Sequence, residues 1–184
     1  MKTFFTALIL SALALSVQAI PTDNAEDALR CCGATTPFYR AYSPSATDHF
    51  YTTSVSEYNT ATSSLGYQKE GIAARVYPAT GTHGVGAVPF YRLYSASGTD
   101  HFYTTSASER DNAVQIGYTY EGVSSYIYPS ALCKSVPFYR LYNPTIVDHF
   151  YTTSLSERNN AINNLGYNNE GVAGYVNSKR SALC

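Results

Sequence analysis

The feature that most limits how this chain can fold is a seven-residue sequence, DHFYTTS, which occurs three times without change. The copies lie at Asp48–Ser54, Asp100–Ser106 and Asp148–Ser154, so they are 52 and then 48 residues apart. Each copy follows a PFYR sequence and precedes a Ser-Glu pair, a Gly-Tyr and a Glu-Gly. A period of this size is typical of repeat architectures, in which one unit needs its neighbours to bury its apolar face. The sequence therefore predicts one unit repeated three times.

The first half of each repeat is predicted to form two strands. In the third copy, alternation over Val136–Tyr142 places Phe138 and Leu141 on opposite faces of a strand. Asn143-Pro144 then turns the chain, and Asp148–Thr153 is rich in aromatic and β-branched residues. The alternation along this second strand puts each His and the neighbouring Asp on opposite sides.

The second half of each repeat is predicted to form a short helix and a last strand. Ser154 and Glu157 have the spacing of a capping box, and Gly166 stands where a left-handed residue ends a helix. Apolar residues between them, including Leu155 and Leu165, mark a helix of two to three turns. The last strands are expected around Ile72–Tyr77, Val123–Tyr128 and Val172–Val176.

Three β-β-α-β units predict a mainly β fold with short helices (α+β), closed into a compact, pseudo-symmetric ring that is propeller-like or trefoil-like. The three-repeat domain is expected to span 37–184, with repeats at 37–78, 89–129 and 137–176 followed by a cysteine-containing tail. A closed arrangement removes the exposed strand edges that would otherwise pair with other chains.

The first residues predict export. Residues 1–19 have a lysine, an apolar run and small residues before Ala19, which is the pattern of a secretory signal peptide. Residues 20–36 are expected to form an acidic arm or propeptide that ends in a pair of cysteines. No other stretch approaches the roughly 20 apolar residues of a membrane span. Positive and negative side chains balance beyond Arg30, which argues against nucleic acid or an anionic membrane as a partner. The predicted location is extracellular or associated with a cell wall.

Four cysteines fit disulfide bonds in an oxidising compartment. Cys31 and Cys32 precede the first repeat, whereas Cys133 and Cys184 follow the second and third repeats. In a closed arrangement of repeats, Cys184 is expected to bond one member of the Cys31–Cys32 pair and Cys133 the other. The sequence leaves open which member bonds which partner.

The combination of an LY-containing strand, DHFYTTS, a helix starting with Glu, a GY and an EG-V resembles a tyrosine-rich repeat of unknown function in secreted fungal and bacterial proteins. The resemblance covers Pro37 to Val176, and Ala41 replaces the Leu of the first strand in copy one. In bacteria such repeats look like appendages of enzymes that degrade cell walls, which implies attachment to glycans. The resemblance carries over no catalytic motif.

Four polar or aromatic residue types recur at equivalent positions of the three repeats and form the predicted carbohydrate-binding set. Its members are Arg40, Asp48, His49, Tyr51, Arg92, Asp100, His101, Tyr103, Arg140, Asp148, His149 and Tyr151. A sugar needs an aromatic face for its C–H groups and directional partners for its hydroxyls. Three equivalent pockets would make a multivalent lectin.

Structural roles compete for the same residues. Each Asp could cap a turn, and each Arg could pair with the Glu of the EG turn. The capping-box glutamates Glu57, Glu109 and Glu157 are expected to be structural, whereas Glu70, Glu121 and Glu170 are ambiguous. Three imidazoles converging on zinc would be a further possibility, but the spacing carries no signature for it. The predicted site residues therefore include no metal ligand, and no cofactor is expected.

An enzyme is the least favoured class. A glycan hydrolase needs an acid and a base in different environments, whereas these repeats are nearly identical. The leading hypothesis is a secreted carbohydrate-binding module, and its rival is a non-catalytic structural or protein-interaction module. The exposure of His49, His101 and His149 separates the two: open aromatic surroundings favour the lectin, and burial in pairs disfavours it.

Overall fold

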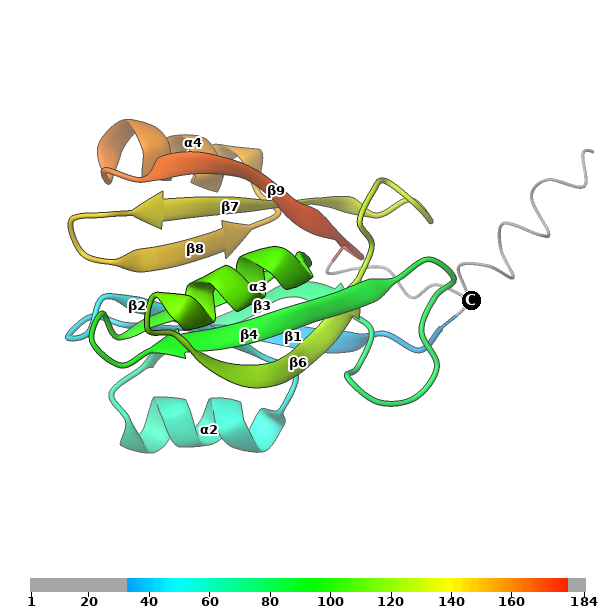
Figure 1. Cartoon of the computed structure of the whole chain (residues 1–184), viewed down its shortest axis with the longest axis horizontal. Helices are drawn as coiled ribbons and strands as arrows, with labels where there is room; N and C mark the ends of the chain where they lie inside the picture. The colour runs from blue at the N-terminus through cyan, green and yellow to red at the C-terminus, as the bar shows by residue number, and fades with distance from the viewer. Residues whose placement is uncertain (1–32, 179–184) are drawn as a thin grey trace, which may run out of the picture.

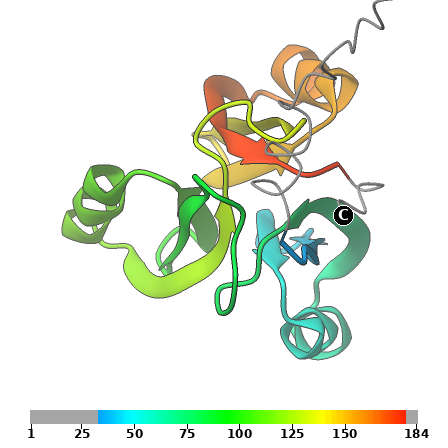
Figure 2. The same ribbon diagram turned by 90° about the vertical axis from the view of Figure 1, so that its right-hand side faces the viewer.

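The computed structural model describes residues 33–178. They form three similar units, each a three-stranded antiparallel sheet with one helix between its second and third strands. The helices lie at the outer corners and the strands lie towards the centre (Figures 1 and 2). The predicted mainly β fold with three short helices is confirmed. The three sheets are separate, so a propeller-like or trefoil-like closure stays a prediction. The signal peptide, most of the acidic arm and Cys31, Cys32 and Cys184 lie outside the described residues.

The elements follow one another in the same order in every unit. They are β1 (Thr36–Ser43), β2 (Asp48–Thr52), α2 (Val55–Ser64), β3 (Gln68–Val76), β4 (Val88–Ser95), β5 (Asp100–Thr104), α3 (Ala107–Gln115), β6 (Thr119–Ile127), β7 (Val136–Asn143), β8 (Asp148–Thr152), α4 (Leu155–Asn164) and β9 (Asn168–Val176).

The first strand of each unit lies in the middle of its sheet. The strand orders are β2-β1-β3, β5-β4-β6 and β8-β7-β9. The third strands begin a few residues before the predicted starts, for example at Asn168 instead of Val172. The reason is that pairing with the first strand continues beyond two register shifts, to pairs such as Leu141 with Asn169. Such bulges allow a strand to bend without losing its partner.

Each helix cap makes only one of the two hydrogen bonds of the predicted capping box. The Ser154 hydroxyl accepts a hydrogen bond from the Glu157 amide at 3.2 Å, as expected. The Ser154 amide, however, donates to the Thr152 hydroxyl at 2.9 Å instead of to the Glu157 carboxylate. The apolar residues mark the helix as predicted, and Leu155 and Leu165 at its two ends are 53% and 56% exposed. Each helix ends before a glycine with positive φ, such as Gly166 at 77°, in agreement with the sequence.

The core consists of two triangles of aromatic rings, one residue of each kind from every unit. Phe38, Phe90 and Phe138 are fully buried, and their ring centroids are 6.3 Å apart in all three pairs. Tyr51, Tyr103 and Tyr151 form the second triangle, with centroids 5.6 Å apart. Edge-to-face contacts of this kind add to the energy of burial. The units therefore share one core, as the repeat pattern predicted.

The buried tyrosines also connect the units by hydrogen bonds. The Tyr103 hydroxyl donates to the Tyr51 carbonyl at 2.7 Å and accepts from the Tyr51 amide at 2.9 Å. Tyr151 makes the same pair of bonds to Tyr103, and Tyr51 makes them to Tyr151. Because β2, β5 and β8 are edge strands, their outward amide and carbonyl groups would otherwise be buried without partners.

The far ends of the third strands make backbone contacts between units. Tyr77 pairs with Tyr126, and Tyr128 pairs with Tyr175, each through two hydrogen bonds of 2.8–3.0 Å. Arg75 and Asn177 form the corresponding pair between the first and third units. Every unit is thus paired with both of the others. None of the helices in the described part of the chain has the length and apolar character needed to cross a membrane.

Candidate binding site

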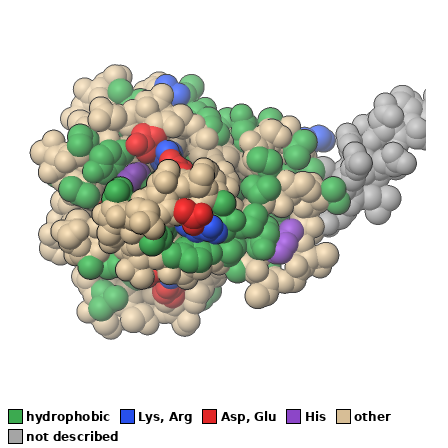
Figure 3. All heavy atoms as spheres, in the orientation of Figure 1, with side chains coloured by type: hydrophobic (Ala, Val, Ile, Leu, Met, Phe, Trp, Pro, Cys, Tyr) green, Lys and Arg blue, Asp and Glu red, His purple; other side chains and the backbone are tan. Residues whose placement is uncertain are grey.

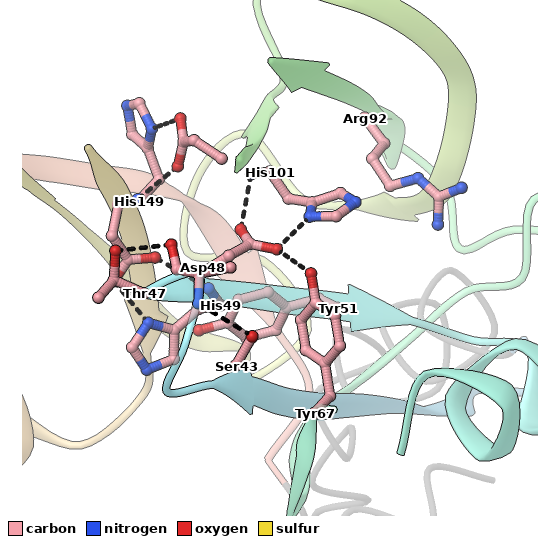
Figure 4. A network of polar contacts seen from close by, with 12 residues as sticks. Ser43, Thr47, Asp48, His49, Tyr51, Tyr67, Arg92, His101 and His149 are labelled. Atoms are coloured by element: carbon pink, nitrogen blue, oxygen red, sulfur yellow. Dashed lines mark hydrogen bonds and ion pairs between the residues drawn. The ribbon is translucent and has the colours of Figure 1, made fainter. Parts of the chain in front are cut away.

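Each histidine of DHFYTTS is bonded to the aspartate of the preceding repeat. His101 Nδ1 lies 2.6 Å from Asp48 Oδ2, and the His101 amide donates to Asp48 Oδ1 at 2.9 Å. The pairs His149–Asp100 and His49–Asp148 repeat this geometry across the other two boundaries. Figure 4 shows the histidine–aspartate pairs where the second strands of the units meet. The alternation explains the arrangement, because adjacent Asp and His residues point to different neighbours.

The aspartates are interior groups. All three are fully buried, and one carboxylate oxygen from each lies within 4.8 Å of the others. A tyrosine from the same repeat donates to each of them, as Tyr118 does to Asp100 at 2.6 Å. Burial alone would raise the pKa of Asp100, but the hydrogen bond and charge of His149 and the Tyr118 hydroxyl outweigh it and hold that pKa below its usual value. The aspartates therefore have a structural role, as the alternative reading predicted, but they bond the histidine of the neighbouring repeat instead of capping a turn.

Each arginine of PFYR connects two carboxylates. Arg40 Nε forms an ion pair of 2.8 Å with Glu70 of the EG turn, as the structural alternative predicted. Its terminal nitrogens donate to both oxygens of Glu157 in the third repeat at 2.9 and 3.1 Å. The guanidinium lies over the Phe150 ring, 5.2 Å from its centroid. Bidentate pairs of this kind fix orientation as well as adding energy.

The same constellation recurs at the other two boundaries. Arg92 joins Glu57 and Glu121 and lies over Phe50, and Arg140 joins Glu109, Glu170 and Phe102 in the same way. Burial would raise the pKa of Glu57, but hydrogen bonds from Arg92 and Thr52 outweigh that effect and lower it. Glu57, Glu109 and Glu157 are structural, as predicted, but through contacts between repeats and not through a reciprocal cap.

A pocket of about 190 Å³ opens at the boundary between the third and first repeats. The first repeat contributes Arg40, His49 and Glu70, and the third contributes apolar and polar groups from β8 and α4. The latter are Phe150, Glu157, Asn160, Ala161, Leu165 and Tyr167. Groups of acidic and basic side chains bordered by hydrophobic ones are visible on one face of the molecule (Figure 3). The pocket combines charged groups with an apolar wall.

The predicted carbohydrate-binding set divides into two groups in the structure. Arg40 and His49 line the pocket, and Arg92, His101, Arg140 and His149 occupy the equivalent positions. The other members are interior and do not face the pocket: Asp48, Asp100, Asp148, Tyr51, Tyr103 and Tyr151 are all fully buried.

The aromatic surroundings of the histidines are closed. The side chains of His49, His101 and His149 are 12%, 12% and 10% exposed. The His49 ring lies 4.6 Å from Tyr42 and 4.7 Å from Phe150, measured between centroids. By the criterion drawn from the sequence, this burial in pairs disfavours the carbohydrate-binding hypothesis at the histidines and favours a structural role for the Nδ1 side of each imidazole. The Nε2 side is the part that lies close to Glu70, at 3.8 Å, beside the pocket.

Sequence reasoning missed the pocket residues that come from the helix side of the preceding repeat. Asn160 and Leu165 carry no conspicuous motif, and they reach the site only because the first repeat packs against the third. Glu70 could have been found, because it recurs as Glu121 and Glu170. Among the described residues, the carboxylates and not the imidazoles converge, so the three-imidazole zinc arrangement is not formed. Cys133 is described, but its pairing stays a prediction.

Residues 37–177 match a family described as "Domain of unknown function (DUF5648)". The match spans all three repeats. No curated protein and no solved structure matches the chain.

Proposed function

Since the chain belongs to the DUF5648 family of domains of unknown function, we propose from its own geometry that it is a secreted, non-catalytic carbohydrate-binding module. Its sites are the boundaries between repeats, where Arg40, His49 and Glu70 and their counterparts meet the helix of the preceding repeat. The observation that carries the proposal is the pocket at one such boundary, together with the recurrence of its charged groups at the other two.

The size of the pocket suits one sugar ring. Its volume of about 190 Å³ exceeds the roughly 150 Å³ of an engineered cavity that admits benzene. Leu165 supplies an exposed apolar wall for the C–H groups of a sugar, and Glu70 and Asn160 supply polar partners for its hydroxyls. Three equivalent sites on one chain would raise the avidity for a polymeric glycan well above the affinity of one site.

A structural or protein-interaction module is the second candidate. It is favoured by the contacts of the recurring aspartates and tyrosines, which are fully buried and engaged between repeats. These residues explain the sequence repeat without any ligand. The two candidates therefore differ in what the pocket does and not in how the domain is held together.

The test is a glycan array and a pull-down on insoluble chitin, glucan, mannan and peptidoglycan. The pocket variant carries arginine at the exposed apolar wall, Leu165→Arg with Leu65→Arg and Ile116→Arg. The control places arginine at the opposite end of each helix, Val55→Arg, Ala107→Arg and Leu155→Arg, where the side chains are also exposed. Neither set touches the ion pairs or the histidine–aspartate pairs, so both should fold.

We expect the natural chain and the control to bind at least one glycan, and the pocket variant to lose at least tenfold in affinity. No binding to any glycan, or equal binding by the two variants, would overturn the proposal. It would then leave the scaffold as the function that the contacts support.

A further inference from the structure

The tautomer of the pocket histidine follows from its partner. Asp148 is a carboxylate that receives the His49 amide, the Tyr167 hydroxyl and His49 Nδ1 at 2.6 Å. A carboxylate accepts hydrogen bonds, so Nδ1 must carry the proton. The other ring nitrogen, Nε2, is on the side of Glu70. It lies 3.8 Å from a Glu70 oxygen, which is too far for a hydrogen bond between them.

Glu70 supplies an acceptor on the same side of the pocket as His49. Its Oε2 atom is paired with Arg40, and within residues 33–178 its Oε1 atom accepts no hydrogen bond. The side chain is 29% exposed, so Oε1 can be reached from solvent. His101 with Glu121 and His149 with Glu170 repeat the arrangement, at 4.0 and 3.7 Å. The pocket therefore offers a carboxylate oxygen as an acceptor, and Glu121 and Glu170 lie at the equivalent positions of the other two boundaries.

The charge of the pocket has the matching sign. The charge of Arg40 is already paired with Glu70 and Glu157, which leaves one more negative than positive group among the three. Directly behind the pocket, the buried Asp148 carboxylate pairs with His49, and this pair adds no net positive charge. A ligand group that carries several donors and a positive charge fits such surroundings, whereas an acidic group would be repelled.

Resting on the proposed carbohydrate binding, we infer that the ligand is a hexosamine with a free, protonated amino group. The ammonium binds Glu70 Oε1, and the sugar ring lies against Leu165. Acetylation of the amine removes both its charge and two of its three donors. The pocket should therefore prefer glucosamine oligomers to the N-acetylated and the neutral glucose oligomers.

Isothermal titration of the whole secreted chain tests this inference with glucosamine trisaccharide, its N-acetylated form, glucose trisaccharide and a simple diamine. Glu70→Gln removes the carboxylate of one pocket and keeps its shape, and Arg40 keeps its bidentate contact with Glu157. Asp111→Asn is the control, because it removes one carboxylate from an exposed position on α3 where it pairs with Arg110. Thermal unfolding checks that both variants are folded.

We expect glucosamine trisaccharide to bind at least tenfold more tightly than the other three ligands. The number of sites should fall from about three to about two in Glu70→Gln and stay unchanged in Asp111→Asn. Binding of the acetylated or glucose oligomer at equal or greater strength would overturn the amine preference and leave carbohydrate binding in place. Equal binding of the diamine would overturn the hexosamine assignment, and binding of none of the sugars would overturn the proposed function itself.

Discussion

Removing a single hydroxyl from the centre of the molecule should have a large effect on stability. In Tyr103→Phe the aromatic ring remains, but the hydroxyl that bonds the Tyr51 amide at 2.9 Å and the Tyr51 carbonyl at 2.7 Å is lost. Both backbone groups lie on a fully buried residue. A buried polar group without a partner costs about 1–3 kcal/mol, so two cost about 2–6 kcal/mol. Because phenylalanine has no hydroxyl to bury, part of this cost is offset, and we expect the free energy of unfolding to fall by about 2–4 kcal/mol.

Urea unfolding followed by fluorescence measures this loss as a lower midpoint at an unchanged slope. The matched control is Tyr39→Phe, whose ring is partly buried and stacks on Tyr58 within its own repeat at 4.9 Å. We expect that control to change the free energy of unfolding by less than about 0.5 kcal/mol. A loss below about 1 kcal/mol in Tyr103→Phe would refute the idea that the phenol satisfies the edge strand. Tyr51→Phe and Tyr151→Phe should behave like Tyr103→Phe.

Three further predictions concern other contacts. The pKa of Asp100 is lowered in the folded state, so its contribution to stability is present above the ordinary carboxyl pKa. That contribution is lost as the pH falls from about 5 towards the folded pKa. Urea midpoints measured against pH should therefore fall less steeply in Asp100→Asn than in the natural chain. Gly174→Ala would bring a Cβ to 2.5 Å from Ile127 Cδ1 and 3.0 Å from the Tyr128 carbonyl, and it should cost about 1–3 kcal/mol. Adding Ile127→Val should recover most of that loss in the same unfolding assay, and no recovery would contradict the steric reason. Arg92→Lys cannot keep the bidentate pair with Glu57 and should cost about 1–2 kcal/mol, whereas a melting temperature equal to that of the natural chain would show that this pair contributes nothing.

Much of the fold could be predicted because the repeat removes ambiguity from local signals. Ser154 and Gly166 marked the helix α4 within a residue or two, and Phe138 and Leu141 do lie in different hydrophobic clusters. The exposure of Leu155 and Leu165 could not be predicted in the same way. Apolar spacing shows that a face exists, but it does not show how much neighbouring structure covers it.

The site was predicted only in part for a related reason. Arg40 and His49 were found because they recur, but recurrence also selected Asp48 and Tyr51, which are interior. Both kinds of residue repeat equally well, since a contact between repeats has to be made three times just as a binding pocket does. Whether a recurring residue is interior or lines the pocket depends on which part of the neighbouring repeat packs against it. That packing cannot be read from one sequence.

The direction of the contacts between repeats limits how such a protein can grow. In every repeat the tyrosine hydroxyl, the histidine and the arginine all reach towards the preceding repeat, and those of the first reach the third. A head-to-tail interface of this kind closes at a fixed number of copies, because each copy is rotated by a set angle from the last. A fourth repeat would have no neighbour for the surface that donates these contacts or for the surface that accepts them, because the other three repeats already pair with one another. Solenoid proteins can lengthen by one repeat at a time, whereas a single repeat added to this architecture would leave its contacting surfaces without partners.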